Sequence, residues 1–364
     1  MTHPPAHQHT GVFRDVLRLV FLELTAACNL HCRHCRADAQ PLAAPDELTR
    51  EELVRVAAEI RAIADPIIIL SGGEPLLRPD FFPIVEDYCA LFSRVALASN
   101  GTLLDDALIR RLMTVGVQRV SVSLDGARAE THDNFRGQAG SYAAALRGCA
   151  SVRRAGMPLQ INVSAGTHNA HELPELLELA QQLGADALHL FLLVPVGCGV
   201  ELSESERLSA QQVEDLLTWL SAQSVALRDT LHLKATCAPM YYRILQQQPA
   251  ARSLTQPAAS GMHAVTRGCL AGSAVCFISR EGKVQPCGYL PVSAGDVREQ
   301  PFARIWQQSA LFTTLRNPKN LSGKCAVCPF SHACFGCRAR AYAVHGDYLA
   351  EEPDCVYLPP TISD

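Results

Sequence analysis

Three cysteines near the start of the chain have the spacing of a metal site with an open position. They lie in the segment CNLHCRHC as Cys28-x3-Cys32-x2-Cys35. Thiolates favour soft metals, but a structural zinc ion or a complete iron–sulfur cluster takes four ligands, and no fourth cysteine is adjacent. The spacing therefore predicts a metal centre that keeps one position for another molecule. A zinc site completed by His31 or His34 is the alternative.

A second group of cysteines lies in the C-terminal part of the chain. Eight thiols follow residue 268: Cys269, Cys276, Cys287, Cys325, Cys328, Cys334, Cys337 and Cys355. The chain has fifteen cysteines, an odd number, and thiols stay reduced in the cytoplasm, so metal is a better explanation than disulfides. Eight thiols suffice for two four-ligand sites. The run from Cys325 to Cys337 is typical of a zinc ribbon or a ferredoxin-like site.

The composition is that of a soluble enzyme. Of the 364 residues, 48% are hydrophobic and 19% charged, and the formal net charge is −4. Basic runs are no longer than a pair, so we expect no nucleic-acid partner. Apolar runs are too short to cross a membrane, and the first residues lack the apolar core of a signal peptide. The chain is therefore expected to be cytoplasmic, with no membrane association.

Apolar strand-like runs alternate with amphipathic helical patterns from Leu17 onward. Six alternations of this kind predict parallel β/α units, and no glycine-rich dinucleotide fingerprint follows the first strand. The fold class is thus α/β, with a partial (β/α)6 TIM-like barrel and a C-terminal cysteine-rich domain. The expected strands are 17–25, 66–70, 94–98, 117–124, 159–165 and 187–196, and the expected helices are 50–63, 79–91, 105–115, 141–155, 172–183 and 209–223.

These elements divide the chain into four parts. Residues 1–16 form a flexible tail, residues 17–225 the barrel, residues 226–268 a connecting segment, and residues 269–364 the cysteine-rich domain. Small cysteine-rich domains obtain much of their folding energy from metal. In the barrel, Cys28, Cys32 and Cys35 follow the first strand, at the end of a barrel where catalytic loops lie.

Four segments at successive strand ends resemble the motifs of the radical S-adenosylmethionine (SAM) superfamily. They are the CX3CX2C loop with His34 before its last cysteine, Gly72-Gly73-Glu74-Pro75, Ser99-Asn100-Gly101, and Ser123-Leu124-Asp125-Gly126. The resemblance implies a catalytic [4Fe–4S] cluster on Cys28, Cys32 and Cys35, with SAM bound at its open iron. It also implies cofactor contacts from His34, Gly72, Gly73, Glu74, Pro75, Ser99, Asn100, Ser123 and Asp125.

The chemistry implied by this family is radical formation. One-electron reduction of SAM gives methionine and a 5′-deoxyadenosyl radical, which takes a hydrogen atom from the substrate. The cofactors supply the radical chemistry, and the protein supplies orientation and exclusion of water.

The C-terminal cysteines resemble the SPASM extension of many radical SAM enzymes. Gly282-x4-Cys287 matches its GX4C element, whereas the last two cysteines of the run are separated by x2 instead of the usual x3. The resemblance implies one or two auxiliary [4Fe–4S] clusters that transfer electrons, with zinc as an alternative. By position, one set is Cys269, Cys276, Cys287 and Cys337, and the other is Cys325, Cys328, Cys334 and Cys355.

Long stretches of the C-terminal half resemble the heme b synthases of the siroheme-dependent heme pathway. Examples are KATCAPMYYRIL (234–245), VQPCGYLPVSAGDVR (284–298) and CRARAYAVHGDYLAEEPDC (337–355). This resemblance implies oxidative decarboxylation of two propionates of iron-coproporphyrin III, with flavodoxin or ferredoxin as electron donor. Substrate contacts are expected from Lys234, Cys237, Tyr242 and Arg243. A solvated helix face, and a thiol without a role at Cys237, are the alternatives.

Other functions remain open from the sequence. A SPASM-type maturase that modifies a peptide shares the architecture, as does another radical SAM enzyme acting on tetrapyrrole side chains. A non-catalytic zinc or iron–sulfur scaffold is a third possibility, opposed by the intact GGEP and CX3CX2C segments.

Overall fold

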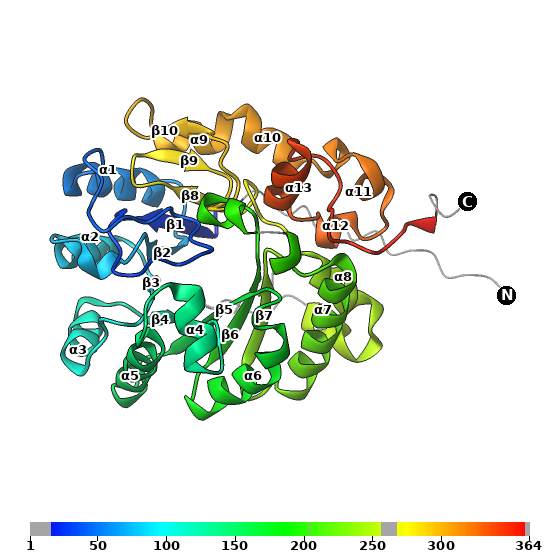
Figure 1. Ribbon diagram of the computed structural model, residues 1–364. Coiled ribbons are helices and arrows are strands. Elements are labelled where there is room, and N and C mark those ends of the chain that lie inside the picture. Colours follow the sequence, from blue (N-terminus) through cyan, green and yellow to red (C-terminus); the bar gives the residue numbers. More distant parts are fainter. Residues whose placement is uncertain (1–15, 203, 256–267, 361–364) are drawn as a thin grey trace.

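One curved, mostly parallel sheet organises the chain (Figure 1). The computed structural model describes residues 16–202, 204–255 and 268–360. The strands are β1 (Leu19–Glu23), β2 (Ile67–Ser71), β3 (Val95–Ser99), β4 (Arg119–Ser123), β5 (Leu159–Ala165), β6 (Ala187–Leu192), β7 (His232–Thr236), β8 (Val275–Ile278), β9 (Lys283–Gln285) and β10 (Gly295–Asp296). Within the described residues the sheet order is β10-β9-β8-β1-β2-β3-β4-β5-β6-β7.

Helices follow most of the parallel strands and lie around the outside of the sheet (Figure 1). They are α1 (Arg50–Arg61), α2 (Phe81–Leu91), α3 (Asp106–Val115), α4 (Ala129–Arg136), α5 (Ser141–Arg154), α6 (Leu173–Gln182), α7 (Ala210–Ala226), α8 (Met240–Gln247), α9 (Phe302–Gln308), α10 (Ala310–Arg316), α11 (Gly323–Val327), α12 (Ser331–Cys334) and α13 (Arg338–His345). The predicted partial barrel is therefore confirmed, and the six expected strands correspond to β1–β6.

Side chains alternate between two faces of the sheet because successive residues of a strand point to opposite sides. In β1, Val20 and Leu22 belong to the large apolar core that also contains helix residues such as Leu53. Their neighbours on the opposite face include Glu23. In β5 and β6 that inner face is polar, since Gln160 donates from Nε2 to Asn162 and lies 3.0 Å from Nδ1 of His189. The barrel interior is thus the polar side of the sheet.

Two elements extend the barrel beyond the six predicted units. The segment 226–268, expected to connect two domains, contains β7 and α8 in its described part, and β7 pairs in parallel with β6. Strand β8, from the cysteine-rich region, pairs in parallel with β1, with Val20 opposite Cys276 and Phe21 opposite Phe277. The C-terminal region therefore continues the barrel sheet at its β1 edge.

Side-chain contacts also attach the C-terminal region to the first helix. Helix α1 begins with a capping box formed by Thr49 and Glu52. The Glu52 carboxylate lies 2.8 Å from the guanidinium of Arg298, and Glu59 accepts a hydrogen bond of 2.6 Å from the backbone N–H of Phe302. The start of α9 is thereby held against α1.

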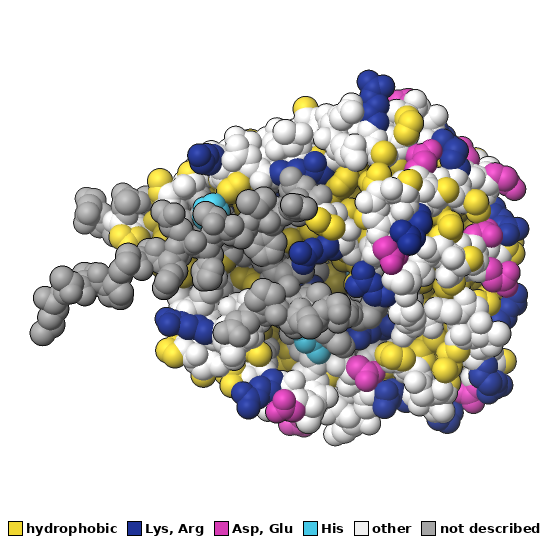
Figure 2. Space-filling model, turned by 180° about the vertical axis from the view of Figure 1, so that it is seen from behind, with side chains coloured by type: hydrophobic (Ala, Val, Ile, Leu, Met, Phe, Trp, Pro, Cys, Tyr) yellow, Lys and Arg dark blue, Asp and Glu magenta, His cyan; other side chains and the backbone are white. Residues whose placement is uncertain are grey.

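The described surface mixes charges of both signs. Figure 2 shows basic and acidic side chains interspersed over the described part of one face. Among the described helices, none has both the length and the apolar character required to traverse a bilayer.

Candidate active site and cysteine clusters

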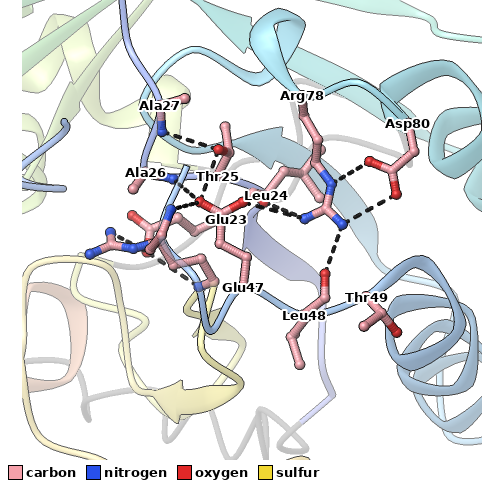
Figure 3. Close-up of polar contacts among 12 residues, drawn as sticks. Glu23, Leu24, Thr25, Ala26, Ala27, Glu47, Leu48, Thr49, Arg78 and Asp80 are labelled. Carbon is pink, nitrogen blue, oxygen red and sulfur yellow. Dashed lines mark hydrogen bonds and ion pairs between the residues drawn. The ribbon is translucent and has the colours of Figure 1, made fainter. Parts of the chain in front are cut away.

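Hydrogen bonds of two charged side chains, Arg78 and Glu47, fix the chain where β1 leads into the loop of the first three cysteines (Figure 3). Arg78, from the segment after β2, donates to the carbonyl oxygens of Leu24 (2.5 Å) and Leu48 (2.7 Å). Glu47 accepts hydrogen bonds from the Thr25 hydroxyl at 3.0 Å and from the backbone N–H of Ala26 at 2.6 Å. The backbone entering the loop is therefore held on two sides.

The loop gathers the three thiols. The N–H of Cys28 donates to Gln40, and the N–H of Gln40 donates to Ala26, so residues 26–40 close on themselves. Burial, together with the charges of Glu74, Cys32 and Cys35, raises the pKa of Cys28 to about 11. That mutual effect reflects the proximity of the three sulfurs. Cys28 is buried, while Cys32 and Cys35 are half-buried.

The Gly72–Pro75 segment lies directly against this loop. The N–H groups of Gly73 and Glu74 donate to the carbonyl oxygens of Thr25 (2.8 Å) and Ala27 (2.7 Å). A Cβ on Gly73 would lie 2.3 Å from the oxygen of Ala27. Only glycine allows this approach, which explains the residue at that position.

Glu74 joins the segment to the next motif. Its fully buried carboxylate accepts hydrogen bonds from the Ser99 hydroxyl at 3.0 Å and from the backbone N–H of Asn100 at 2.8 Å. Burial raises the pKa of Glu74 to about 7, although these hydrogen bonds act to lower it. The Asn100 amide then donates to Asn29 at 2.8 Å and lies 3.9 Å from the sulfur of Cys28. The motifs after β2 and β3 thus meet at the first cysteine.

Asp125, after β4, connects to the second cysteine through an arginine. Its carboxylate lies 2.5 Å from the guanidinium of Arg136, which is 3.7 Å from the sulfur of Cys32. The backbone N–H of Ser164 donates to the other carboxylate oxygen at 2.7 Å. Although Asp125 is fully buried, the charge of Arg136 keeps its pKa below the usual value. Ser123 lies on the inner face of β4 and is half-buried.

His34 fits into an aromatic stack. Its ring stacks on Phe135 with 4.2 Å between centroids, and Phe135 stacks on His168 at 3.8 Å. Burial lowers the pKa of His34 to about 3, despite Asp125 at 3.8 Å. The ring is therefore neutral at ordinary pH. His31, the other candidate for a zinc ligand, is exposed.

Helix α4 supplies two of these partners, although the sequence pattern did not predict it. It presents His132, Phe135 and Arg136 as its buried residues. Their i, i+3, i+4 spacing is the signal that could have revealed a buried helix face. With Asn100 and Arg136 directed at two of the sulfurs, the donor set fits an iron–sulfur cluster, whose sulfurs characteristically accept hydrogen bonds.

A cleft of about 310 Å³ opens beside Cys35, with the next residue, Arg36, in its lining. Arg36 and Arg280 line it, and both guanidiniums contact the buried carboxylate of Glu23, at 3.1 and 3.4 Å. Its apolar lining includes Phe277, Tyr289, Tyr342, Pro195 and Val196. The cleft therefore combines aromatic walls with two arginines, which pair with the carboxylates of Glu23 and Glu281 in the same lining.

Four of the C-terminal thiols surround a second, smaller cavity. Cys325, Cys328, Cys334 and Cys355 all line it, in agreement with their grouping by sequence position. Arg243 also lines this cavity, where it pairs with Glu214 and lies over the ring of Tyr357 at 5.3 Å. Among the described residues, no three histidine, cysteine or acidic side chains converge closely enough to hold a single metal ion.

The other predicted ligand set is only partly brought together. Cys269 lies near Cys287 and Cys337, since the charge of Cys269 raises the pKa of both thiols. Cys276 is fully buried in the apolar core, and burial raises its pKa, whereas the charge of Arg316 lowers it. The structure does not bring Cys276 to the other three.

The four predicted substrate contacts are dispersed. Lys234 lies on the inner face of β7, opposite His189 in the register. Cys237 follows β7, and Tyr242 and Arg243 are buried in α8. The described cleft beside Cys35 is lined by none of the four. Arg36 and Arg280, which were not among the predicted substrate contacts, line it instead.

Comparisons with known proteins agree with this arrangement. Residues 22–180 match the family model of the radical SAM superfamily, and residues 269–329 match that of SPASM, an iron–sulfur cluster-binding domain. The AdoMet-dependent heme synthase of Methanosarcina barkeri is 48% identical over 343 residues, which cover 94% of this chain and 97% of that protein. The protein of the same name from Nitratidesulfovibrio vulgaris is 40% identical over 360 residues, 98% of this chain and 97% of its own.

A solved structure supports the fold. The crystal structure of Streptococcus suis SuiB bound to precursor peptide SuiA has a TM-score of 0.72 and 14% identity, covering 94% of this chain and 76% of that one. At this identity the likeness concerns the fold alone.

The fold and the three-thiol site define a radical SAM enzyme with a C-terminal SPASM domain. Its radical SAM domain binds a [4Fe–4S] cluster and SAM, and its SPASM domain binds auxiliary iron–sulfur clusters. Within that superfamily, the chain belongs to the family of the AdoMet-dependent heme synthases.

Proposed function

We propose that this enzyme makes heme b from iron-coproporphyrin III by oxidative decarboxylation of two propionates to vinyl groups. The observation that supports this substrate most directly is the cleft beside Cys35, with its aromatic walls and its two arginines. The high identity to heme synthases over nearly the whole chain supports the same class of reaction.

A coproporphyrin is a flat apolar ring with four propionates at its edge. Such a ligand needs apolar and aromatic walls with a few cationic groups placed for its carboxylates. In the cleft, Phe277 provides such a wall, with Arg36 4.5 Å above its ring centroid. Arg280 reaches the same cleft from the end of β8. Both arginines are held by Glu23, so their positions are set before a propionate arrives.

The bound [4Fe–4S] cluster and SAM supply a 5′-deoxyadenosyl radical when an electron enters the site. For each propionate, one hydrogen atom leaves the β-carbon and the bond between the α-carbon and the carboxylate breaks. The products are a vinyl group, carbon dioxide and one electron. Two SAM molecules are consumed per heme, because two propionates react.

The residues around the thiols orient and enclose this chemistry. Backbone hydrogen bonds from Gly73 and Glu74 hold the segment after β2 against the cysteine loop. Arg136, which is buried, carries a positive charge between Asp125 and Cys32. The stack of His34, Phe135 and His168 closes the site with aromatic rings. These groups exclude water from a reaction that passes through radicals.

The electron released by each decarboxylation needs an acceptor. Gly288, the residue after Cys287, lines the cleft. An auxiliary cluster held there would lie next to the substrate, in a position to accept that electron. The electron that cleaves SAM is proposed to come from flavodoxin or ferredoxin, in the cytoplasm.

The direct test is anaerobic incubation with iron-coproporphyrin III, SAM and a reductant, followed by mass spectrometry of the porphyrin. Each turnover should remove one carbon dioxide and two hydrogens, with a singly decarboxylated intermediate before heme b. Formation of 5′-deoxyadenosine with unchanged porphyrin would contradict the proposal. A mass change on a peptide encoded beside this gene would then favour the maturase alternative, and one on another tetrapyrrole would favour a different side-chain reaction.

A further inference from the structure

The direction of a strand side chain separates Cys276 from the cysteines with which it was grouped. Strand β8 pairs with β1 so that Cys276 lies opposite Val20, and Phe277 opposite Phe21. Paired residues share a face of the sheet, and Val20 belongs to the outer apolar core. Cys276 therefore points to the helix layer, where Arg316 is its charged neighbour. Phe277 points inward to the cleft and to Arg36.

Cys237, at the end of β7, lies near the cysteines from which Cys276 points away. It directly follows the last residue of β7 and is partly buried, like Cys287 and Tyr289. Pro239, two residues later, lies against Gly268, since a Cβ on Gly268 would be 2.8 Å from the Cβ of Pro239. Gly268 immediately precedes Cys269. The segment after β7 is thus in contact with the start of the cysteine-rich domain.

Electrostatics gives the same grouping. Burial raises the pKa of Cys237 well above its usual value, and the charges of Cys337, Cys287 and Cys269 add to this effect. These three thiols, which come from different segments of the SPASM domain, therefore lie near Cys237.

Arg340 and the backbone hold Cys237 in place. The guanidinium of Arg340, fully buried in α13, donates to the carbonyl oxygen of Cys237 at 2.9 Å. Arg340 is one helical turn beyond Cys337. Cys237 has a φ of 55°, the left-handed conformation that residues with a Cβ rarely adopt. Such strain persists where the surroundings determine the conformation, and it is concentrated at functional sites.

We propose that Cys237, from the barrel, is the fourth ligand of the first auxiliary cluster, together with Cys269, Cys287 and Cys337. Cys276 is then a core residue. Each ligating thiol binds iron as a thiolate and releases its proton to solvent. The cluster would join β7 to the SPASM domain, and it would adjoin the cleft through Gly288 and Tyr289, which line that cleft.

The test compares Cys237→Ser with Cys276→Ser in the full-length, anaerobically reconstituted protein, with Cys269→Ser as reference. Iron content and the electron paramagnetic resonance spectrum of the reduced protein are measured without substrate. We expect Cys237→Ser to resemble Cys269→Ser, with the loss of about four irons per chain or a changed auxiliary signal. Cys276→Ser should retain the wild-type iron content and spectrum.

A second variant separates the thiol from the fold. Cys237→Gly removes the thiol and also relieves the left-handed backbone, so backbone strain would not explain a loss of iron. It should show the same loss as Cys237→Ser, with unchanged circular dichroism. Wild-type iron and spectrum in both Cys237 variants would overturn the proposal. Loss of auxiliary iron in Cys276→Ser with Cys237→Ser unaffected would assign the ligand to Cys276 instead.

Discussion

The guanidinium of Arg36 donates a hydrogen bond of 3.4 Å to the carbonyl oxygen of Gly288. Arg36 directly follows Cys35, and Gly288 directly follows Cys287. One side chain therefore links the backbone next to Cys35, in the three-cysteine loop, with the backbone next to Cys287, a proposed ligand of an auxiliary cluster. Arg36 and Gly288 both line the cleft, so a molecule bound there lies between the cysteine set of Cys35 and that of Cys287.

Replacing Arg36 should impair turnover more than SAM cleavage. Arg36→Ala removes the contact with Gly288 and one of the two cationic partners of buried Glu23. Hydrogen bonds to charged groups contribute about 1.5–3 kcal/mol, so porphyrin turnover should fall by roughly 10- to 100-fold. Slow SAM cleavage without substrate should continue. Turnover is measured by product mass, and cleavage by 5′-deoxyadenosine.

Arg50→Ala is a suitable control for charge removal. Arg50 pairs with Asp87 on the surface, and exposed pairs of this kind contribute little. Its turnover should match the wild type. Equal turnover for wild type and Arg36→Ala would remove Arg36 from the substrate site.

His34 should act through its ring and not through its charge. Because the pKa of His34 is lowered to about 3 by burial, His34→Phe should retain most SAM cleavage, as the ring still stacks on Phe135. His34→Ala should lose a stack in which each pair contributes about 0.5–1.5 kcal/mol, and its SAM cleavage should fall severalfold. Near-complete loss in His34→Phe would instead indicate an essential imidazole nitrogen.

The same histidine has a consequence for acid stability. Its unfolded pKa is near 6.5 and its folded pKa about 3, so the unfolded chain binds more protons between these values. The free energy of unfolding therefore falls as pH decreases from 6.5 toward 3. In the metal-free chain, His34→Phe should lose less stability than wild type over this window, as measured by denaturant titration at several pH values. Parallel curves would contradict the pKa assignment.

Gly73→Ala should disable the cofactor site. The added Cβ would lie 2.3 Å from the oxygen of Ala27 and 2.7 Å from that of Ala26, so the cysteine loop must move. Gly140→Ala is the matched control, because Gly140 is left-handed and no neighbouring atom would lie within 4 Å of its added Cβ. It should cost only the backbone strain of about 1–2 kcal/mol. SAM binding by isothermal titration should be lost in the first variant and kept in the second, and SAM binding by Gly73→Ala at wild-type affinity would refute this packing.

The four cysteines around the smaller cavity should hold a cluster that forms independently of the other sites. Cys325→Ala or Cys355→Ala should remove about four irons per chain, because both thiols line the same cavity. The iron at Cys28, Cys32 and Cys35, and the substrate-free cleavage of SAM, should remain. Stoichiometric zinc at this site in the wild type would show a zinc module instead.

Local periodicity made the barrel predictable. Strands such as β2 are short apolar runs, and the helices between them have regular apolar faces, so β1–β6 were placed from the sequence. Strand β7, which reads HLKAT, was missed because only Leu233 and Ala235 are apolar, whereas β2, also of five residues, is a nearly continuous apolar run. Helix α4 was missed because its sequence, AETHDNFR, is mostly polar and contains Phe135 as its single large apolar residue.

The cysteine and arginine roles depend on contacts that no local pattern contains. Strand β8 reads VCFI, an apolar run in which nothing in the sequence shows which face Cys276 occupies. The pairing register between β8 and β1 determines the face on which Cys276 lies. Arg243 was expected at the substrate, but its pairing with Glu214, 29 residues away, places it beside the second thiol cavity. Sequence motifs thus named residues that the structure brings together around the three thiols, whereas tertiary pairing located the cleft.

Transfer of deuterium tests the central claim most directly. Iron-coproporphyrin III carrying deuterium at the β-carbons of its propionates is incubated anaerobically with SAM, reductant and the reconstituted enzyme. The account predicts that 5′-deoxyadenosine gains one deuterium for each carbon dioxide released, and that the heme b product lacks that deuterium. Unlabelled 5′-deoxyadenosine, with the porphyrin retaining all of its deuterium, would contradict it.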